Sequence, residues 1–294
     1  MRQEEITSID LHMHTTVSDG TDTPEEIIGR VKSAGIGIFS VTDHDAVLGS
    51  RTVLDLLGDE DPFFVTGVEF SAKDEKGKYH ILGYHYDPGA PAILAAVHKA
   101  HELRMRKVHA RLDFLKERFG IAFPEEDLSK LLALNNPGKP HIANLMVEHG
   151  FAKDRDSAIR DFIDQKRFTT EYLTPKEVIR AVLDGGGIPV LAHPVYGSGD
   201  DLILGEDLED RIKHLMPYGL AGAEAFYSGF TDRLRQQVLA LAEKYGLYVT
   251  AGSDYHGTNK LVRLGETNYT GKRGTVPGLE RFLARVLDDR EREK

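Results

Sequence analysis

Two pairs of potential metal-binding side chains each have one residue between their members. The first pair, His12 and His14, lies near the amino end, and the second, Asp254 and His256, lies near the carboxyl end. Because side chains alternate across a β-strand, this spacing directs both members of a pair to the same face. Imidazoles and carboxylates that converge on one face are typical ligands of transition metals. Together, the two pairs predict a metal site.

Further candidate ligands lie between these pairs, each at the end of an apolar run. Such runs predict buried strands. The carboxyl ends of strands are where α/β barrels build their active sites, so we expect the side chains that follow them to share one space. The runs are 36–42 before Asp43 and His44, 63–68 before Glu69, 188–192 before His193, and 247–252 before Asp254 and His256.

Composition limits the classes of partner. With 294 residues and 40% hydrophobic content, the chain can bury a sizeable core. Its net charge of −10 argues against binding duplex nucleic acid, although a local basic pocket for a small anion is compatible with it. The chain has no cysteine, so any metal must be held by nitrogen and oxygen. No stretch is long and apolar enough for a membrane span or a signal peptide, so we expect a cytoplasmic protein.

Strand and helix signals alternate over most of the chain. Thr23-Pro24-Glu25-Glu26 predicts a helix start with an N-cap threonine, a proline at the first position and a capping-box glutamate, and Thr174-Pro175-Lys176-Glu177 repeats this pattern. Another helix is expected over roughly 232–245, before Gly246. Repeated strand-helix units predict an α/β fold with a parallel sheet, either open or closed into a barrel.

The pattern changes between residues 91 and 173. Strand signals stop there, and helical periodicity with many charges continues through 95–119, 125–134 and 142–149. We therefore expect a discontinuous main domain of 1–90 and 174–294. The segment 91–173 would be a helical insertion, placed so that it could cover the predicted metal site.

Seven ordered motifs resemble those of the PHP (polymerase and histidinol phosphatase) family. In the insertion, Lys139-Pro140-His141-Ile142-Ala143 also resembles a segment of its stand-alone phosphoesterase branch, which includes nucleoside 3′,5′-bisphosphate phosphatases. The resemblance implies a distorted seven-stranded (β/α) barrel with a trinuclear metal centre that hydrolyses phosphate esters. The motifs are His12-x-His14, Ser18-Asp19-Gly20, Thr42-Asp43-His44-Asp45, Gly67-Val68-Glu69, His80-Ile81-Leu82-Gly83-Tyr84, Ala192-His193-Pro194 and Ser253-Asp254-Tyr255-His256-Gly257.

The resemblance also implies which side chains hold the three divalent ions, with manganese expected and iron or zinc as alternatives. Glu69 would bridge two of the ions. Such a centre can activate a water and stabilise the leaving alkoxide, so no protein nucleophile is required. The implied sets are His12, His14, Glu69 and Asp254 for the first ion, Glu69, His80 and His193 for the second, and Asp19, His44 and His256 for the third.

Catalytic and substrate-binding roles are expected for a smaller group. Asp43 neighbours His44 and should face away from it on a regular strand, so we expect it to orient the ligand rather than bind the metal. His141 could bind phosphate or protonate a leaving group. Lys139, Arg167 and Tyr227 are the other candidates for substrate binding.

Two positions differ from the pattern of the bisphosphate phosphatases. Lys139 stands where that branch has arginine, and lysine is a point charge rather than a bidentate phosphate ligand. Phe230 stands where the branch tends to have histidine. These changes leave the metal ligands intact and alter the expected nucleotide pocket.

We therefore expect a metal-dependent phosphoesterase that acts on a small phosphorylated sugar or nucleotide. Phosphoribosyl 1,2-cyclic phosphate is the first candidate, hydrolysed as a diester and then as a monoester, and a nucleoside 3′,5′-bisphosphate is the alternative. Two other classes stay open: a noncatalytic metal-binding module, which low metal occupancy would favour, and a hydrolase of C–N bonds, which activity on amides would favour. No feature of the sequence indicates an oligomeric state.

Overall fold

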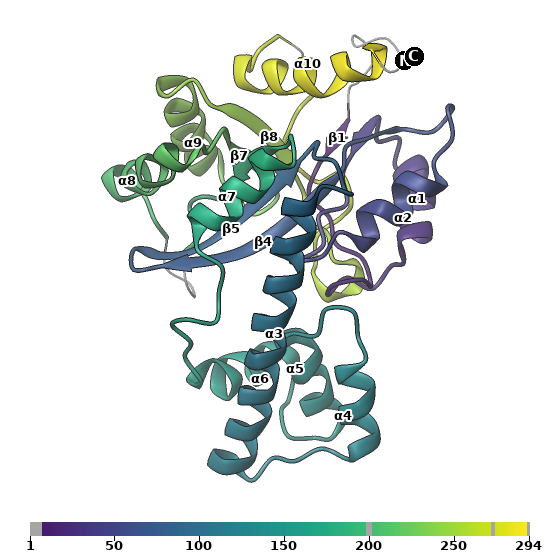
Figure 1. Cartoon of the computed structure of the whole chain (residues 1–294), viewed down its shortest axis with the longest axis vertical. Coiled ribbons are helices and arrows are strands. Elements are labelled where there is room, and N and C mark those ends of the chain that lie inside the picture. Colours follow the sequence, from purple (N-terminus) through teal and green to yellow (C-terminus); the bar gives the residue numbers. More distant parts are fainter. Residues whose placement is uncertain (1–7, 198–201, 272–273, 293–294) are drawn as a thin grey trace.

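The computed structural model describes residues 8–197, 202–271 and 274–292. Residues 1–7, which bear on the expectation about a signal peptide, lie outside these ranges. An α/β body carries a lobe of helices at one end, and the carboxyl-terminal helix α10 (Pro277–Arg292) lies at the opposite end (Figure 1). Among the described residues, no helix has both the length and the apolar character that a membrane crossing requires.

Two sheets form the centre of the α/β body. The first has three parallel strands, β1 (Ile9–Asp10), β2 (Ile38–Phe39) and β3 (Phe63–Phe64), in that order. In the second sheet the five strands are also in chain order, β5 is antiparallel to both neighbours, and the remaining pairs are parallel. Its strands are β4 (Gly67–Asp74), β5 (Gly77–Tyr84), β6 (Ile188–Leu191), β7 (Gly222–Tyr227) and β8 (Tyr248–Gly252).

The two sheets meet at both ends. At one end, the Leu11 N–H donates to the Ala251 carbonyl at 2.8 Å, and at the other an isolated parallel bridge pairs His44 with Glu69. A mixed α/β fold is confirmed, whereas a seven-stranded barrel is not. One reason is the turn between β4 and β5, which is short enough to join only antiparallel strands. A second reason is that β1, β2 and β3 pair over only two residues each, because loops follow these short strands.

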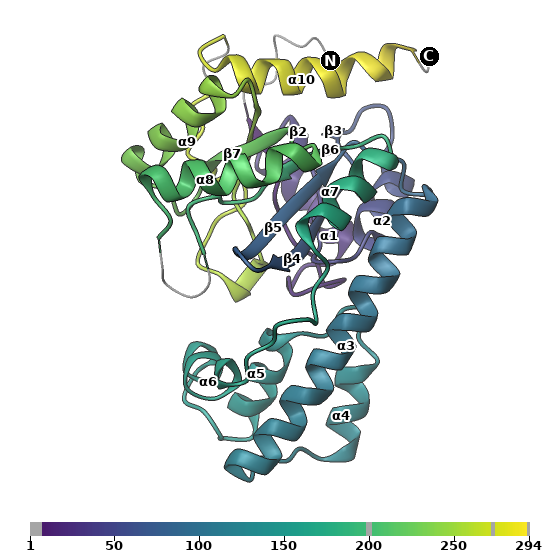
Figure 2. The same ribbon diagram turned by 60° about the vertical axis from the view of Figure 1, so that its left-hand side comes forward.

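Helices cover the sheets, and both predicted capping boxes are present. The Thr23 side chain accepts from the Glu26 N–H at the start of α1, and Thr174 accepts from the Glu177 N–H at the start of α7. Helix α7 packs on β4, β5 and β6, and Figure 2 shows it lying against β5. The helices of the body other than α10 are α1 (Pro24–Ser33), α2 (Leu48–Leu56), α7 (Pro175–Asp184), α8 (Gly205–Leu215), η3 (Met216–Tyr218), α9 (Asp232–Lys244) and η4 (Gly257–Asn259).

The helical lobe is formed by the segment expected to be an insertion. Its long helix α3 packs on α7 near its start and then runs down into the lobe (Figures 1 and 2). The lobe has a hydrophobic cluster of its own, with Val108, Ile142 and Met146 fully buried in it. The division of the chain into separate domains at 91 and 173 stays a prediction. The elements are α3 (Pro91–Phe119), α4 (Glu125–Leu132), α5 (Lys139–Glu148), α6 (Arg155–Asp161) and η2 (Ile163–Gln165).

Candidate metal centre

The candidate ligands lie in or just after the strands and converge on one point between the two sheets. His12 and His14 follow β1, and Asp254 follows β8. The Asp254 N–H donates to the His12 carbonyl at 2.8 Å, which fixes these two segments side by side. His44 follows β2, Glu69 and His80 lie in β4 and β5, and His193 follows β6.

Glu69 lies at the middle of this group. It is 1% exposed, and both of its carboxylate oxygens face imidazole nitrogens. This is the position that a carboxylate shared by two ions requires. Its Oε2 lies 3.4 Å from Nε2 of His12, 3.4 Å from Nε2 of His14 and 2.9 Å from Nδ1 of His44, and its Oε1 lies 3.0 Å from Nδ1 of His80 and 3.2 Å from Nε2 of His193.

Two further carboxylates flank Glu69. Asp254 Oδ1 lies 3.3 Å from His14 Nε2, and Asp19 Oδ1 lies 3.3 Å from His256 Nε2. The resulting clusters overlap the three implied ligand sets, with His14 and His44 each taking part in two clusters. The side chains whose ligand atoms all lie within 4.8 Å of one another are His14, Asp19, His44 and His256; His12, His14 and Asp254; and His44, Glu69 and His80.

Several buried ligand atoms in the centre have no hydrogen-bond partner in the part of the chain that the structure describes. A buried polar atom left unpaired costs free energy, so such atoms usually have an unstated partner. Here they are ring nitrogens and a carboxylate oxygen that face one another, which is the donor set of a hard to borderline divalent cation. The residues therefore fit metal ions. The atoms are Nε2 of His12, Nε2 of His14, Nδ1 of His44, Nδ1 of His80 and Oε2 of Glu69.

Burial and neighbouring carboxylates divide the histidines of the centre into two groups. Burial lowers the pKa of His14 to about 3 and that of His80 to about 3, so both rings stay neutral at neutral pH. Burial alone would also lower the pKa of His12 and His44, but neighbouring carboxylates, Glu69 among them, raise the pKa of both rings. Burial alone would raise the pKa of Glu69, but the neighbouring His44 and His80 hold it well below its usual range. A cation bound beside Glu69 would therefore take the place of protons on His12 and His44.

Glu224 in β7 holds two of the candidate ligands in place. It is fully buried; its Oε1 lies 2.9 Å from His12 Nδ1, and its Oε2 accepts from the His193 N–H at 2.8 Å. With Nδ1 engaged in this way, the His12 ring presents Nε2 to the centre. No pattern singled Glu224 out, although a lone acidic residue in the apolar strand Gly222–Tyr227 is a signal that could have found it.

Two buried aspartates support the loops that carry the ligands. Asp43 accepts from the Thr15 N–H at 2.8 Å and from the hydroxyls of Thr15 at 2.7 Å and Ser18 at 2.6 Å, so it faces the loop after His14. This is compatible with the orienting role expected for it. Asp10 accepts from the Ser253 hydroxyl at 2.6 Å and from the Gly265 N–H at 2.7 Å, and burial raises its pKa to about 6. Asp10 was also missed from the sequence.

Two candidate ligands of the centre have strained backbones. His193 has a φ of 28° and Asp254 a φ of 60°, both in the left-handed region that non-glycine residues rarely adopt. Such residues persist only where the surrounding structure determines them, and they cluster at functional sites. Here the bond from the His193 N–H to Glu224 and that from the Asp254 N–H to the His12 carbonyl hold the two backbones in place.

Side chains of the insertion reach the centre directly. Arg104 of α3 forms an ion pair with buried Asp45, and the Asn136 amide donates to the His44 carbonyl. The ring of His141 forms a hydrogen bond with the backbone of Ser18, and burial lowers the pKa of this ring. The His141 Nδ1 accepts from the Gly138 N–H at 3.1 Å. These contacts place the insertion against one side of the centre.

The remaining predicted substrate residues lie in two places. Tyr227 is at the centre, where its hydroxyl donates to Asp254 Oδ2 at 2.8 Å. Lys260 pairs with the same carboxylate. Lys139 and Arg167 lie farther out, in a pocket between the insertion and the β4–β5 strands, where Lys139 Nζ is 2.6 Å from Asp164 Oδ1.

Comparisons with known proteins agree with this geometry. The PHP domain model matches residues 10–174. The chain is 31% identical over 265 residues to a phosphoribosyl 1,2-cyclic phosphate 1,2-diphosphodiesterase of Eggerthella lenta, covering 84% of this chain and 94% of that protein. It is 28% identical to a 3′,5′-nucleoside bisphosphate phosphatase of Chromobacterium violaceum, covering 85% and 88%. A 5′-3′ exoribonuclease of Haemophilus influenzae is 27% identical, covering 93% and 98%.

Solved structures extend the similarity to the whole fold. A protein of Bifidobacterium adolescentis described as a metal-dependent phosphoesterase superposes with a TM-score of 0.78 at 27% identity, covering 95% of this chain and 96% of that one. A Chromobacterium violaceum protein described as an amidohydrolase also gives 0.78, over 95% and 96%. Its 24% identity shows a shared fold alone.

Proposed function

The chain belongs to the PHP domain family and is a hydrolase of phosphate ester bonds, and from this premise we propose that it uses three divalent ions to hydrolyse a small phosphorylated sugar or nucleotide. The premise sets aside a noncatalytic module and a hydrolase of C–N bonds. The observation that carries the proposal is the convergence of imidazole nitrogens on the buried carboxylate of Glu69.

The residues assigned to the ions are those implied by the sequence motifs. Glu69 would be shared by two ions, since each of its oxygens faces a different group of imidazoles. Manganese is the ion we expect, with iron and zinc as alternatives, because an all-nitrogen and oxygen donor set admits each of them. Bound ions would supply Lewis acidity to the phosphoryl oxygens and activate water for attack.

The chain's own residues would position the reactants around the ions. Glu224 keeps Nε2 of His12 directed at the centre, and Asp43 holds the Thr15–Ser18 loop that carries Asp19. Tyr227, whose hydroxyl donates to Asp254, would bind the substrate beside that ligand at the rim of the centre. We assign His141 to the leaving group, because it extends from the insertion and its ring bonds the backbone of Ser18, next to the candidate ligand Asp19.

For the substrate, we favour phosphoribosyl 1,2-cyclic phosphate, with a nucleoside 3′,5′-bisphosphate as the second candidate. The relative named for the cyclic compound is 31% identical, and the one named for the bisphosphate is 28% identical, so similarity gives the first only a narrow lead. Phe230 supports it further, since it packs against Tyr227 with ring centroids 5.1 Å apart at a position where a histidine was expected for nucleotides.

The test is to measure phosphate release by manganese-loaded protein given phosphoribosyl 1,2-cyclic phosphate or adenosine 3′,5′-bisphosphate in parallel. We expect the cyclic compound to have the higher kcat/KM. A higher value for the bisphosphate would assign the second candidate instead. Faster cleavage of a 5′-phosphorylated oligoribonucleotide than of either small compound would contradict the small-substrate assignment.

A further inference from the structure

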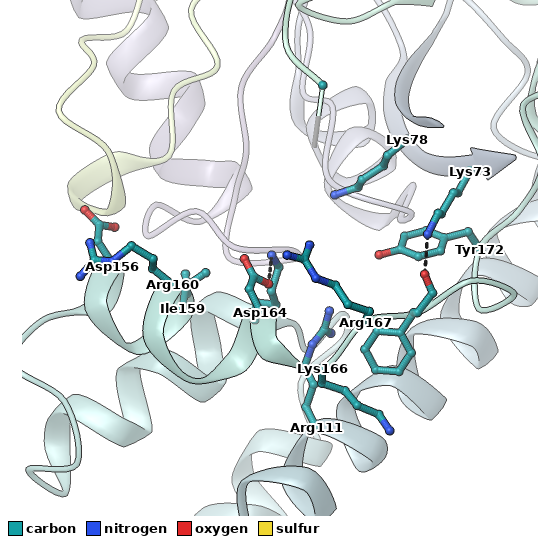
Figure 3. A pocket seen from close by; sticks show the side chains of 13 residues that line it. Lys73, Lys78, Arg111, Asp156, Ile159, Arg160, Asp164, Lys166, Arg167 and Tyr172 are labelled. Carbon is teal, nitrogen blue, oxygen red and sulfur yellow. Dashed lines mark hydrogen bonds and ion pairs between the residues drawn. The ribbon is translucent and has the colours of Figure 1, made fainter. Parts of the chain in front are cut away.

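A basic pocket of about 620 Å³ lies at the seam between the insertion and the body. In Figure 3, Lys73 and Lys78 approach it from the body, and Arg111, Asp164 and Arg167 approach it from the insertion. Seven cationic side chains and two carboxylates line it, in a chain whose net charge is −10. Such a local reversal of charge attracts anions. The cations that the argument uses are Lys73, Lys78, Arg111, Lys139, Lys166 and Arg167.

Arg111 is the buried member of this group. It is 6% exposed, and its guanidinium lies 4.9 Å from the centroid of the Phe168 ring and bonds the Tyr172 side chain. Among the residues that the structure describes, its Nε has no hydrogen-bond partner. Burying a cation with an unpaired donor is costly unless an anion completes the site. The planar guanidinium also offers a fork of donors that suits the oxygens of a phosphate.

Lys78 connects the pocket with the metal centre. It lies in β5 two residues before His80, so both side chains leave the same face of the strand, about 7 Å apart along it. The Lys78 ammonium is close enough to His80 to lower the pKa of that ring. Lys139 and Arg111 are in turn close enough to Lys78 to lower the pKa of its ammonium. A single pentose ring can span this spacing between two phosphates.

We propose that this pocket binds a second, non-reacting phosphate of the substrate, held by Arg111, Lys78 and Lys139, while the scissile phosphate lies at the metal centre. The inference rests on the proposed function and adds a requirement to it: the enzyme selects compounds that carry two phosphates on one sugar. In phosphoribosyl 1,2-cyclic phosphate the second group is the 5-phosphate, and in a 3′,5′-bisphosphate it is the 5′-phosphate.

The direct test measures the binding of ribose 5-phosphate to metal-stripped protein by calorimetry, because this ligand contains the second phosphate and no scissile one. Arg111→Gln should weaken binding about 10- to 100-fold through the loss of a charge-assisted contact. The double variant Lys139→Gln and Arg167→Gln, at more exposed positions, should weaken it at least about 10-fold without threatening the fold. Lys130→Gln removes an exposed insertion lysine and should bind like the wild type.

A kinetic test uses substrate pairs that differ only in the second phosphate. These are adenosine 3′,5′-bisphosphate against adenosine 3′-monophosphate, and phosphoribosyl 1,2-cyclic phosphate against ribose 1,2-cyclic phosphate. The wild type should prefer the doubly phosphorylated member, and both pocket variants should lose about 10-fold or more of that preference. Ribose 5-phosphate that binds the wild type no better than ribose, or pocket variants that keep wild-type affinity, would overturn the inference. Hydrolysis of neither pair by metal-loaded protein that still binds ribose 5-phosphate in the pocket would instead overturn the proposed function.

Discussion

The metal centre and the basic pocket lie next to each other but are built from different parts of the fold. The centre consists of short side chains, buried or half-buried, in or near strand ends, and Glu224 holds two of the ligand segments through His12 and His193. The pocket consists largely of long cationic side chains, several of them from the insertion, and Arg111 is the buried one among them. On the proposed assignments, the body would carry out the reaction, and the insertion would help to select the phosphorylated compound.

The largest effect should come from removing the carboxylate at the middle of the centre. Glu69→Ala would eliminate the group that faces five imidazoles, and we expect kcat to fall about 10³-fold or more, since each metal contributes several kcal/mol of stabilisation to the transition state. Metal content should fall in the same sample. Steady-state kinetics and elemental analysis would measure both, with Glu148→Ala, an exposed glutamate of the insertion, as the control. Near-normal turnover would disprove the assignment of Glu69.

A second experiment destabilises the insertion and asks whether the metal centre stays intact. Met146 is fully buried in the hydrophobic cluster of the insertion, and Met146→Ala should cost about 3 kcal/mol of stability. Hydrogen exchange should speed up in α3 to α6, and metal content should stay at the wild-type value. Val147→Ala, at a 36% exposed position on the same helix, should change stability by less than about 1 kcal/mol. A loss of metal in Met146→Ala would show that the two regions are not separable.

A smaller effect is expected at the buried carboxylate that orients His12. Glu224→Gln keeps the size of the side chain but removes its charge, and we expect metal affinity and kcat to fall about 10- to 100-fold, as for other residues that orient a ligand. KM should stay close to the wild-type value, because Glu224 does not contact the pocket. A metal titration followed by kinetics at saturating metal would separate the two effects. A change in KM alone would contradict a positioning role.

The smallest effect is expected on stability, when each of two glycines is replaced by alanine. A Cβ at Gly252 would lie 2.2 Å from the His12 Cβ and 2.4 Å from Glu224 Oε1, so Gly252→Ala should cost about 1–2 kcal/mol and lower Tm by several degrees. A Cβ at Gly29, in α1, would meet no atom within 4 Å, so Gly29→Ala should be neutral or stabilising by up to about 1 kcal/mol. Equal Tm values for the two variants would show that the His12 framework tolerates displacement.

The sequence predicted the parts of the fold that depend on local chemistry. Threonine caps with a proline and a glutamate define α1 and α7, because the cap bonds form within four residues. Apolar runs were expected to form the strands that precede Glu69, His193 and Asp254, since a buried strand must be apolar. His193 and Asp254 do follow β6 and β8, whereas the run 63–68 is divided between β3 and β4 and Glu69 lies inside β4. Sheet closure could not be predicted in the same way, because it depends on pairing between distant segments such as Leu11 and Ala251.

At the candidate site, the motifs identified ligands but not the residues that support them. The histidines and carboxylates of the centre stand out because such side chains are rarely buried without a function. Glu224 and Asp10 work through hydrogen bonds to His12 and Ser253, and these contacts become evident only when the chain is folded. The same holds for Lys78 and Arg111, which look like ordinary strand and helix charges until the insertion folds over β5.

Metal dependence is tested most directly by a metal titration of chelator-treated protein, with bound metal and phosphate release measured in the same samples. Activity should be lost on chelation and return with manganese as the protein takes up three ions per chain, and Glu69→Ala should retain fewer. Activity that survives complete removal of metal, or wild-type protein that binds no divalent ion, would contradict the proposed metal centre.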